Sequence, residues 1–190
     1  MTAAGDEYFR YLRGRSRVGA LYRQWWLYPR VAKRLRGRCL DVGCGIGDML
    51  AYRGCETVGV DINQSNVAYC RTRGLSAQVM DVDRLPFGEC EFDSVLMDNV
   101  LEHIPGPAPL LAEANRVLRR QGRLLVGVPG RRGWASDPDH KVFYDENSLR
   151  ECVSASGFTL TECFHTPLWR SSFLDRHVRQ YCVYGLFLKA

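Results

Sequence analysis

The sequence has no long hydrophobic run. A membrane-spanning helix needs about 20 consecutive apolar residues, and no segment of the 190 residues approaches that length. The first residues, MTAAGDEYFRYLRGR, also lack the apolar segment of a secretory signal peptide. We therefore expect a cytoplasmic protein whose length suits one domain with an ordinary core.

Closely spaced cysteine pairs are missing as well. The eight cysteines, at positions 39, 44, 55, 70, 90, 152, 163 and 182, include no C-x2-C pair of the kind that zinc knuckles require. Most of them lie within apolar runs. We interpret them as reduced thiols in the core.

Two common phosphate-binding patterns are absent from the glycine-rich stretch CLDVGCGIGDML, residues 39–50. A G-x-x-x-x-G-K-[ST] loop needs a lysine and a hydroxyl after its last glycine, where this chain has an aspartate and a methionine. The dinucleotide pattern G-x-G-x-x-G fails because Gly43, Gly45 and Gly47 occupy every second position. The stretch still indicates a strand followed by a glycine turn, which lets a ligand approach bare backbone.

What the sequence does contain is a set of carboxylates around this turn. Asp41 precedes the glycines, Asp48 follows them, and Asp61 and Asp81 end the next two predicted strands. Four carboxylates at one edge of a sheet would repel a pyrophosphate. They suit a ligand with hydroxyl groups, an amine donor and a positively charged tail. S-adenosylmethionine has all three.

Hydrophobic periodicity predicts an α/β fold with a doubly wound, mostly parallel sheet of seven strands in a three-layer α/β/α arrangement. We expect strands at 38–43, 57–62, 76–82, 92–99, 122–129, 158–165 and 181–189, and helices at 47–53, 64–72, 107–119 and 145–156. Because only about 15 residues separate the last two strands, we expect the final strand to be antiparallel. Ligands of such sheets bind at the carboxyl ends of the strands.

Over residues 37–189 the chain resembles the class I, Rossmann-like S-adenosylmethionine-dependent methyltransferases of the small stand-alone type. LDVGCGIG is similar to the first motif of that family, VGVDIN to its second-strand acidic motif, VMDVDRLPF to its adenine-side motif and FDSVLMDNVLEHI to its fourth strand. GRLLVGVPG and HKVFYDENSLRECVSASGF resemble its fifth strand and following helix. The combination of these segments is specific, whereas the glycine turn alone would be a weak signal.

The resemblance implies where the cofactor would bind. The backbone at Gly43, Cys44 and Gly45 would pass under the methionine moiety, and Asp41 would help to hold its ammonium group. Asp61 would accept hydrogen bonds from both ribose hydroxyls, because a carboxylate has two oxygens. The full predicted cofactor-binding set is Asp41, Gly43, Cys44, Gly45, Gly47, Asp61, Ile62, Asp81, Val82, Asp98 and Asn99.

Methyl transfer to a hydroxyl also needs a base. The candidates are His103, His140, Tyr144 and the pair Asp98 and Asn99, with a purely structural role as the alternative for His103. Asn99, Glu102 and His103 also resemble the E-x-x-E-H pattern of some metal-assisted O-methyltransferases, but an asparagine replaces the first carboxylate. A neutral amide is a weaker ligand for a hard divalent ion, so we expect no metal.

Residues 1–36 form a basic, aromatic N-terminal arm ahead of the cofactor-binding domain at 37–190. Residues 1–38 contain ten Lys and Arg and two acidic residues, a net charge of 10 − 2 = +8. We predict that the arm is a helical lid in which Tyr22, Trp25 and Trp26 pack over the cleft. The arginines expected to face an anionic acceptor, or the inner face of the membrane that presents it, are Arg13, Arg15 and Arg17. The alternative is a helix that only closes the core.

We therefore predict a methyltransferase that uses S-adenosylmethionine and acts on the oxygen of a small-molecule or lipid-linked glycan acceptor. A quinone-like phenol is a second acceptor class. A non-catalytic S-adenosylmethionine-binding regulator and an NAD oxidoreductase are the alternative functions. Methylation of nucleic-acid bases is disfavoured, because DNVLEH stands where such enzymes commonly carry N-P-P-[YF].

Overall fold

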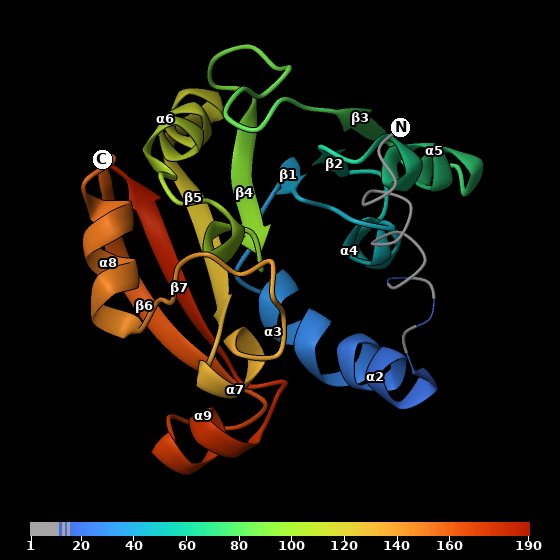
Figure 1. The fold of residues 1–190 in the computed structure, drawn as a ribbon. Helices are drawn as coiled ribbons and strands as arrows, with labels where there is room; N and C mark the ends of the chain where they lie inside the picture. Colours follow the sequence, from blue (N-terminus) through green and yellow to red (C-terminus); the bar gives the residue numbers. More distant parts are fainter. Residues whose placement is uncertain (1–11, 13, 15) are drawn as a thin grey trace.

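The strands form one twisted sheet. The computed structural model describes residues 12, 14 and 16–190, and its sheet has the order β3-β2-β1-β4-β5-β7-β6 (Figure 1). The strands are β1 (Cys39–Val42), β2 (Thr57–Asp61), β3 (Ala77–Val79), β4 (Phe92–Asp98), β5 (Leu118–Pro129), β6 (Phe158–Thr166) and β7 (Cys182–Lys189). Strands β1 to β5 pair in parallel, whereas β7 is antiparallel to both β5 and β6. The predicted sheet, with its antiparallel last strand, is confirmed.

Helices cover both faces of this sheet and complete the three predicted layers (Figure 1). The α-helices are α2 (Arg17–Tyr22), α3 (Tyr28–Ala32), α4 (Asp48–Arg53), α5 (Gln64–Thr72), α6 (Ala108–Val117), α7 (Arg131–Trp134), α8 (Glu146–Ser154) and α9 (Ser172–His177). A π-helix, η1 (Arg23–Leu27), joins α2 to α3, and a 3-10 helix, η2 (Leu101–His103), follows β4. Within the described residues, no helix combines the length and the hydrophobicity that crossing a membrane requires.

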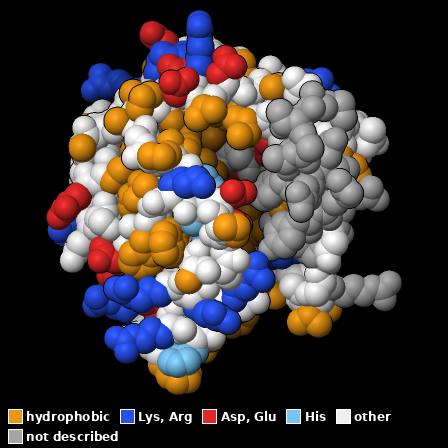
Figure 2. Space-filling view, viewed as in Figure 1, with side chains coloured by type: hydrophobic (Ala, Val, Ile, Leu, Met, Phe, Trp, Pro, Cys, Tyr) orange, Lys and Arg blue, Asp and Glu red, His pale blue; other side chains and the backbone are white. Residues whose placement is uncertain are grey.

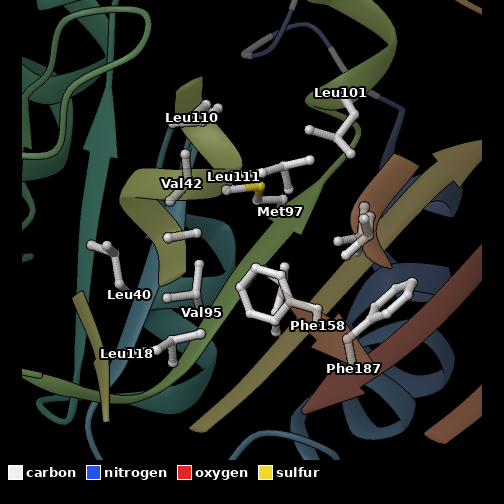
Figure 3. Packing of buried hydrophobic residues seen from close by; sticks show 14 of the residues in the cluster. Leu40, Val42, Val95, Met97, Leu101, Leu110, Leu111, Leu118, Phe158 and Phe187 are labelled. Atoms are coloured by element: carbon white, nitrogen blue, oxygen red, sulfur yellow. The ribbon is translucent and has the colours of Figure 1, made fainter. Parts of the chain in front are cut away.

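Side chains of the central strands face two hydrophobic clusters in alternation. Leu40 and Val42 of β1 pack with Val95 and Met97 of β4 beneath α6 and α8 (Figure 3). Cys39 belongs to the other cluster, beneath α3 and α4. Successive side chains of a strand point to opposite faces, so burial of both faces explains why these strands read as nearly continuous apolar runs.

The second half of the arm belongs to the core. Leu27, Val31 and Leu35 are buried and lie in the same cluster as Leu125 of β5 and Tyr184 of β7. Burying an aliphatic side chain of this size stabilises a fold by about 1.5–3 kcal/mol. Residues 27–35 are thus packed on the sheet. Only the part of the arm that precedes residue 27 could act as a lid.

Arginines of the arm are bound to the rest of the chain. Arg34 is buried, pairs with the Glu162 carboxylate, and has its guanidinium 3.5 Å from the centre of the Phe164 ring. The Arg36 guanidinium donates to the Gln121 carbonyl at 2.6 Å. For these two side chains the basic run serves to anchor the arm.

The short elements differ from the sequence-based expectation. Helices α7 and α9 were not predicted, because 4 and 6 residues are too few to show a helical period. Strand β5 begins at Leu118 instead of 122, since Leu118 already pairs with Phe92 of β4. Strand β3 ends at Val79 instead of 82, because the chain turns back where Asp81 bridges to Arg84.

Candidate functional site: two joined clefts at the carboxyl edge of the sheet

Two clefts open where the parallel strands end. The first cleft lies between the arm, the glycine turn, α7 and β7, and its walls include Asp41, Cys44, Gly45, Asp98, His140 and Tyr184. The second cleft is lined by Asp61, Ile62, Met80, Val82 and Leu110, among others. Gly43, Asn99 and His103 line both, so the clefts meet there. Figure 2 shows this face of the molecule hollowed beside hydrophobic and acidic side chains.

The glycine turn brings bare backbone to the meeting point. Gly43 and Gly45 have φ angles of +74° and +54°, a region that side chains disfavour. The Gly43 and Cys44 amides donate to the Val60 carbonyl at 2.8 and 3.0 Å, which fixes the turn to β2. A Cβ atom on Gly43 would lie only 2.7 Å from the Val100 Cγ2. The first two glycines of the motif are therefore required at the cleft.

Gly47 has a different role. It lines neither of the two clefts. Its φ angle is +80°, and a Cβ atom there would lie 2.7 Å from Leu75 and 2.8 Å from the Cys70 sulfur. The structure places this glycine against α5, where it permits close packing of the turn.

Asp61 is held by the turn itself. Its carboxylate is buried; Oδ2 accepts from the Gly45 amide at 2.8 Å and Oδ1 from the Asn63 amide at 2.7 Å. Burial raises the pKa of Asp61, and these backbone hydrogen bonds oppose the rise. Both oxygens are thereby fixed at the end of β2, with Ile62 beside them in the second cleft.

The first cleft has a carboxylate wall. Asp41 is buried, and its pKa is raised well above the usual range by that burial and then by Asp98 and Asp61. Asp98 accepts from the Tyr184 hydroxyl at 2.8 Å and from the side-chain amide of Asn99 at 3.1 Å. A cationic group between Asp41 and Asp98 would relieve this crowding of negative charge.

Asp81 is not brought to this wall. It is exposed and lines neither cleft, whereas Val82, next to it, lines the second one. The early end of β3 explains the difference, because the chain has already turned before Asp81 reaches the sheet edge.

Two histidines and a buried glutamate form a cluster beside the point where the two clefts meet. The His103 and His140 rings have centroids 4.7 Å apart, and His140 Nε2 lies 3.8 Å from the Glu102 Oε1. Both Glu102 oxygens are buried and have no hydrogen-bond partner among the described residues. Burial, with the charges of Asp98 and Asp137, raises the pKa of Glu102 to about 8.

Backbone carbonyls orient both imidazoles. His103 Nδ1 lies 3.3 Å from the Asp139 carbonyl and His140 Nδ1 lies 2.8 Å from the Trp134 carbonyl. Donation from Nδ1 leaves Nε2 as the basic nitrogen in each neutral ring. Burial and the neighbouring His140 lower the pKa of His103, which favours its neutral form at pH 7.

The same cluster is one of two groups with metal-ligand geometry in the described part of the chain. One ligand atom from each of Glu102, His103 and His140 lies within 4.8 Å of the others, and the second group is Glu146, Cys163 and His165. In the second group the glutamate is already engaged by Arg170 at 2.6 Å. The sequence pattern missed His140 as a member of the first group, because His140 comes from a loop far from Glu102 in sequence.

Tyr144, Trp25 and Trp26 lie away from the clefts. Tyr144 is buried in the core, beside Cys152, and lines neither cleft. The lid prediction is wrong for Trp25, which is 75 % exposed, and for Trp26, whose indole donates to the Pro167 carbonyl; neither lines the clefts. Tyr22 does line the first cleft, as predicted. Arg13, Arg15 and the Arg17 side chain lie outside the described residues.

Comparison with known proteins agrees with this geometry. Residues 40–126 match the family model of a methyltransferase domain. A probable S-adenosylmethionine-dependent methyltransferase of Mycobacterium tuberculosis is 30% identical over 159 residues, covering 76% of this chain and 58% of that protein. A ubiquinone biosynthesis O-methyltransferase of Hahella chejuensis is 36% identical over 104 residues, covering 50% and 44%. The chain thus spans about half the length of these curated relatives.

Solved structures show the same fold. A Thermotoga maritima protein described as an S-adenosylmethionine-dependent methyltransferase has a TM-score of 0.75 at 20% identity, over 96% of this chain and 98% of that one. The [4+2]-cyclase SpnF has a TM-score of 0.68 at 22% identity, over 86% and 80%. The sheet order and the glycine turn define a Rossmann-like methyltransferase fold. Residues 40–126 thus match a methyltransferase domain, and the chain is similar to S-adenosylmethionine-dependent methyltransferases.

Proposed function

We propose that the protein transfers the methyl group of S-adenosylmethionine to an oxygen of a small-molecule acceptor. The observation that carries the proposal is the position of His103, a ring with a lowered pKa at the junction of the two clefts. The nucleoside would occupy the second cleft beside Asp61. The amino-acid tail would pass Gly43 toward Asp41, so that the methyl group faces the first cleft.

The chemistry requires alignment and removal of one proton. Bound S-adenosylmethionine would supply the methyl group to the acceptor hydroxyl, and His103 Nε2 would accept the proton of that hydroxyl. A cation then forms on the imidazole. The Glu102 carboxyl group lies in the same cluster, so the new charge would develop near a group that can ionise.

The acceptor class is inferred from the first cleft. Its lining combines apolar Leu12, Leu27 and Pro129 with polar Ser136 and Gln180, a mixture that fits a ring carrying hydroxyl groups. Two acceptors suit it: a quinone-like phenol and the sugar of a lipid-linked glycan. The Hahella relative is a ubiquinone biosynthesis O-methyltransferase by name, which supports the phenol.

A labelling experiment tests the proposal. The protein is incubated with S-adenosylmethionine labelled in its methyl group and with catechols or extracted glycan lipids, and the label is followed into a methyl ether. We expect label in one acceptor pool. The His103→Gln variant should lose about 10²- to 10⁴-fold in turnover while binding the cofactor as the parent does, and His177→Gln, in an exposed histidine on α9, is the matched control.

A non-catalytic regulator is the alternative, and the cyclase with this fold shows why it must be tested. Fold and activity are separable properties. Cofactor binding without methyl transfer to any acceptor would favour the regulator. Full turnover by His103→Gln would support a methyltransferase but would refute the role of His103 as the base. Binding of NAD in preference to S-adenosylmethionine would favour an oxidoreductase. The cytoplasmic location stays part of the proposal.

A further inference from the structure

Large apolar side chains are exposed around α9. Trp169 is 68 % exposed, Phe173 65 % and Leu168 47 %. Helix α9 has no buried residue, and it projects beyond the sheet at the lower end of Figure 1. A large apolar side chain left in water gives up the stabilisation that burial would supply, so three such residues in one short segment require an explanation.

Basic side chains surround these residues. Over α7 and α9, Figure 2 shows Lys and Arg side chains gathered around a histidine and a hydrophobic side chain. The arginines of this region are Arg131, Arg132, Arg170, Arg176 and Arg179, and its acidic residues are Glu146 and Asp175, which gives 5 − 2 = +3. We name these arginines, together with Leu168, Trp169 and Phe173, the α9 surface.

The α9 surface is held firmly by the fold. The Arg131 amide donates to the Asp175 Oδ1 at 2.8 Å, which joins α7 to α9. The Ser171 side chain caps the first turn of α9, and Leu174 and Val178 pack against the main core. The exposure of Trp169 and Phe173 therefore belongs to a fixed segment of the native structure.

The α9 surface also adjoins the first cleft. Arg179, next to α9, and Gln180 line that cleft, as does Gly133 of α7. The indole of Trp26 donates to the Pro167 carbonyl, so the arm touches the same loop. A partner bound on the α9 surface would sit at the mouth of the cleft.

We propose that the α9 surface docks on an anionic lipid bilayer and so presents the first cleft to an acceptor held in that bilayer. Tryptophan and phenylalanine insert at the boundary between lipid headgroups and acyl chains, while arginines contact the lipid phosphates. A nucleic acid fits less well, because single strands need a basic groove along which bases stack. On the α9 surface the aromatics project outward with an aliphatic leucine beside them. The proposal concerns binding alone and requires no methyl transfer.

Vesicle sedimentation tests the docking. Wild-type protein is mixed with vesicles of phosphatidylcholine, with or without a third of phosphatidylglycerol, at low and high salt. We expect binding to the anionic vesicles that weakens as salt screens the charges. The double variant Arg132→Gln/Arg176→Gln should bind roughly 10- to 30-fold more weakly. The matched control Arg120→Gln/Arg150→Gln removes two exposed arginines from the start of β5 and from α8, and should bind as the parent does.

A second measurement identifies the inserted side chain. Lipids brominated in their acyl chains should quench the fluorescence of the wild type, and Trp169→Phe should remove most of that quenching while keeping vesicle binding within about twofold. Trp169→Ser/Phe173→Ser should lose binding roughly tenfold with an unchanged Tm, because both residues are exposed. Equal losses in the control double variant, quenching that persists in Trp169→Phe, or binding to single-stranded RNA in preference to anionic vesicles would each overturn the proposal.

Discussion

The two sides of the clefts differ in how their polar groups are satisfied. On the β2 side, both oxygens of Asp61 already accept backbone hydrogen bonds. On the opposite side, the two oxygens of Glu102 are buried with no hydrogen-bond partner among the described residues. Buried polar groups are normally paired. The polar groups on the β2 side are therefore hydrogen-bonded before a ligand binds. On the histidine side, Glu102 still lacks a partner within the described part of the chain and can accept a proton or interact with a charge.

The largest expected effect concerns Glu102, on the histidine side, and is a dependence of protein stability on pH. Glu102 has a pKa of about 8 in the fold, well above the 4.5 of the unfolded chain. The contribution of Glu102 to the free energy of unfolding is therefore fully present below pH 4.5 and is lost as the pH rises through 8. We expect Glu102→Gln to exceed the parent in stability at pH 9 by several kcal/mol, on the order implied by a shift of this size, and to match it near pH 5.

Thermal unfolding at the two pH values measures this difference. Glu113→Gln is the control, because Glu113 is paired with Arg116 and its pKa is lowered. A stability difference between Glu102→Gln and the parent that is the same at pH 5 and pH 9 would show that Glu102 is ionised throughout.

The next effect lies on the satisfied side. Asp61→Ala should weaken S-adenosylmethionine binding, since charged hydrogen bonds contribute about 1.5–3 kcal/mol each and less where water replaces them. The Gly45 and Asn63 amides lose their acceptor as well. Calorimetric titration measures the loss, and His140→Asn, on the other side, should bind the cofactor as the parent does. Equal affinity in Asp61→Ala and the parent would refute the assignment of the second cleft to the nucleoside.

A smaller effect tests the arm. Leu12 is buried, lines the first cleft, and would lie 3.2 Å from a Cβ atom on Gly45. Deleting residues 1–20 removes this cover but spares Leu27, Val31 and Leu35, so the protein should still fold, with a Tm lowered by the loss of the buried Leu12. Cofactor affinity should fall by about 1.5 kcal/mol, the lower end for burial of a leucine. Anionic acceptors should also bind more weakly at low salt if Arg13, Arg15 and Arg17 face them, and unchanged values for both ligands would leave the arm a purely structural role.

The smallest effect concerns the carboxylate wall of the first cleft. Tyr184→Phe removes the hydroxyl that donates to Asp98 at 2.8 Å and should destabilise the protein by about 0.5–1.5 kcal/mol. Denaturant unfolding measures it. Tyr69→Phe, in a partly exposed tyrosine of α5, serves as the control. An equal change in stability in both variants would show that the hydrogen bond from Tyr184 to Asp98 does not stabilise the protein.

The cofactor side could be predicted because its signals are local. Asp41, Gly43 and Asp61 lie within one continuous strand, turn, helix and strand, and the hydrogen bond from the Gly45 amide to Asp61 joins the two ends of that unit. Asp81 shows the limit of this reasoning, since β3 ends at Val79 instead of at residue 82 and Asp81 is left exposed. Tyr144 shows another limit, because whether a tyrosine lines a cleft or the core depends on the packing of α8 and not on its neighbours in sequence.

By itself, the sequence determined the order of strands and helices, the left-handed glycine turn and the carboxylate that ends β2, because periodicity, glycine sterics and adjacent backbone bonds act over short distances. Only the tertiary structure decided that His140 meets Glu102, that Tyr184 reaches Asp98 from the antiparallel strand, and that Arg34 anchors the arm to β6. Those contacts depend on which strands become neighbours in the sheet. Which strands pair is determined by the burial of both faces of the sheet at the same time. This burial depends on the whole chain and cannot be read from any single segment.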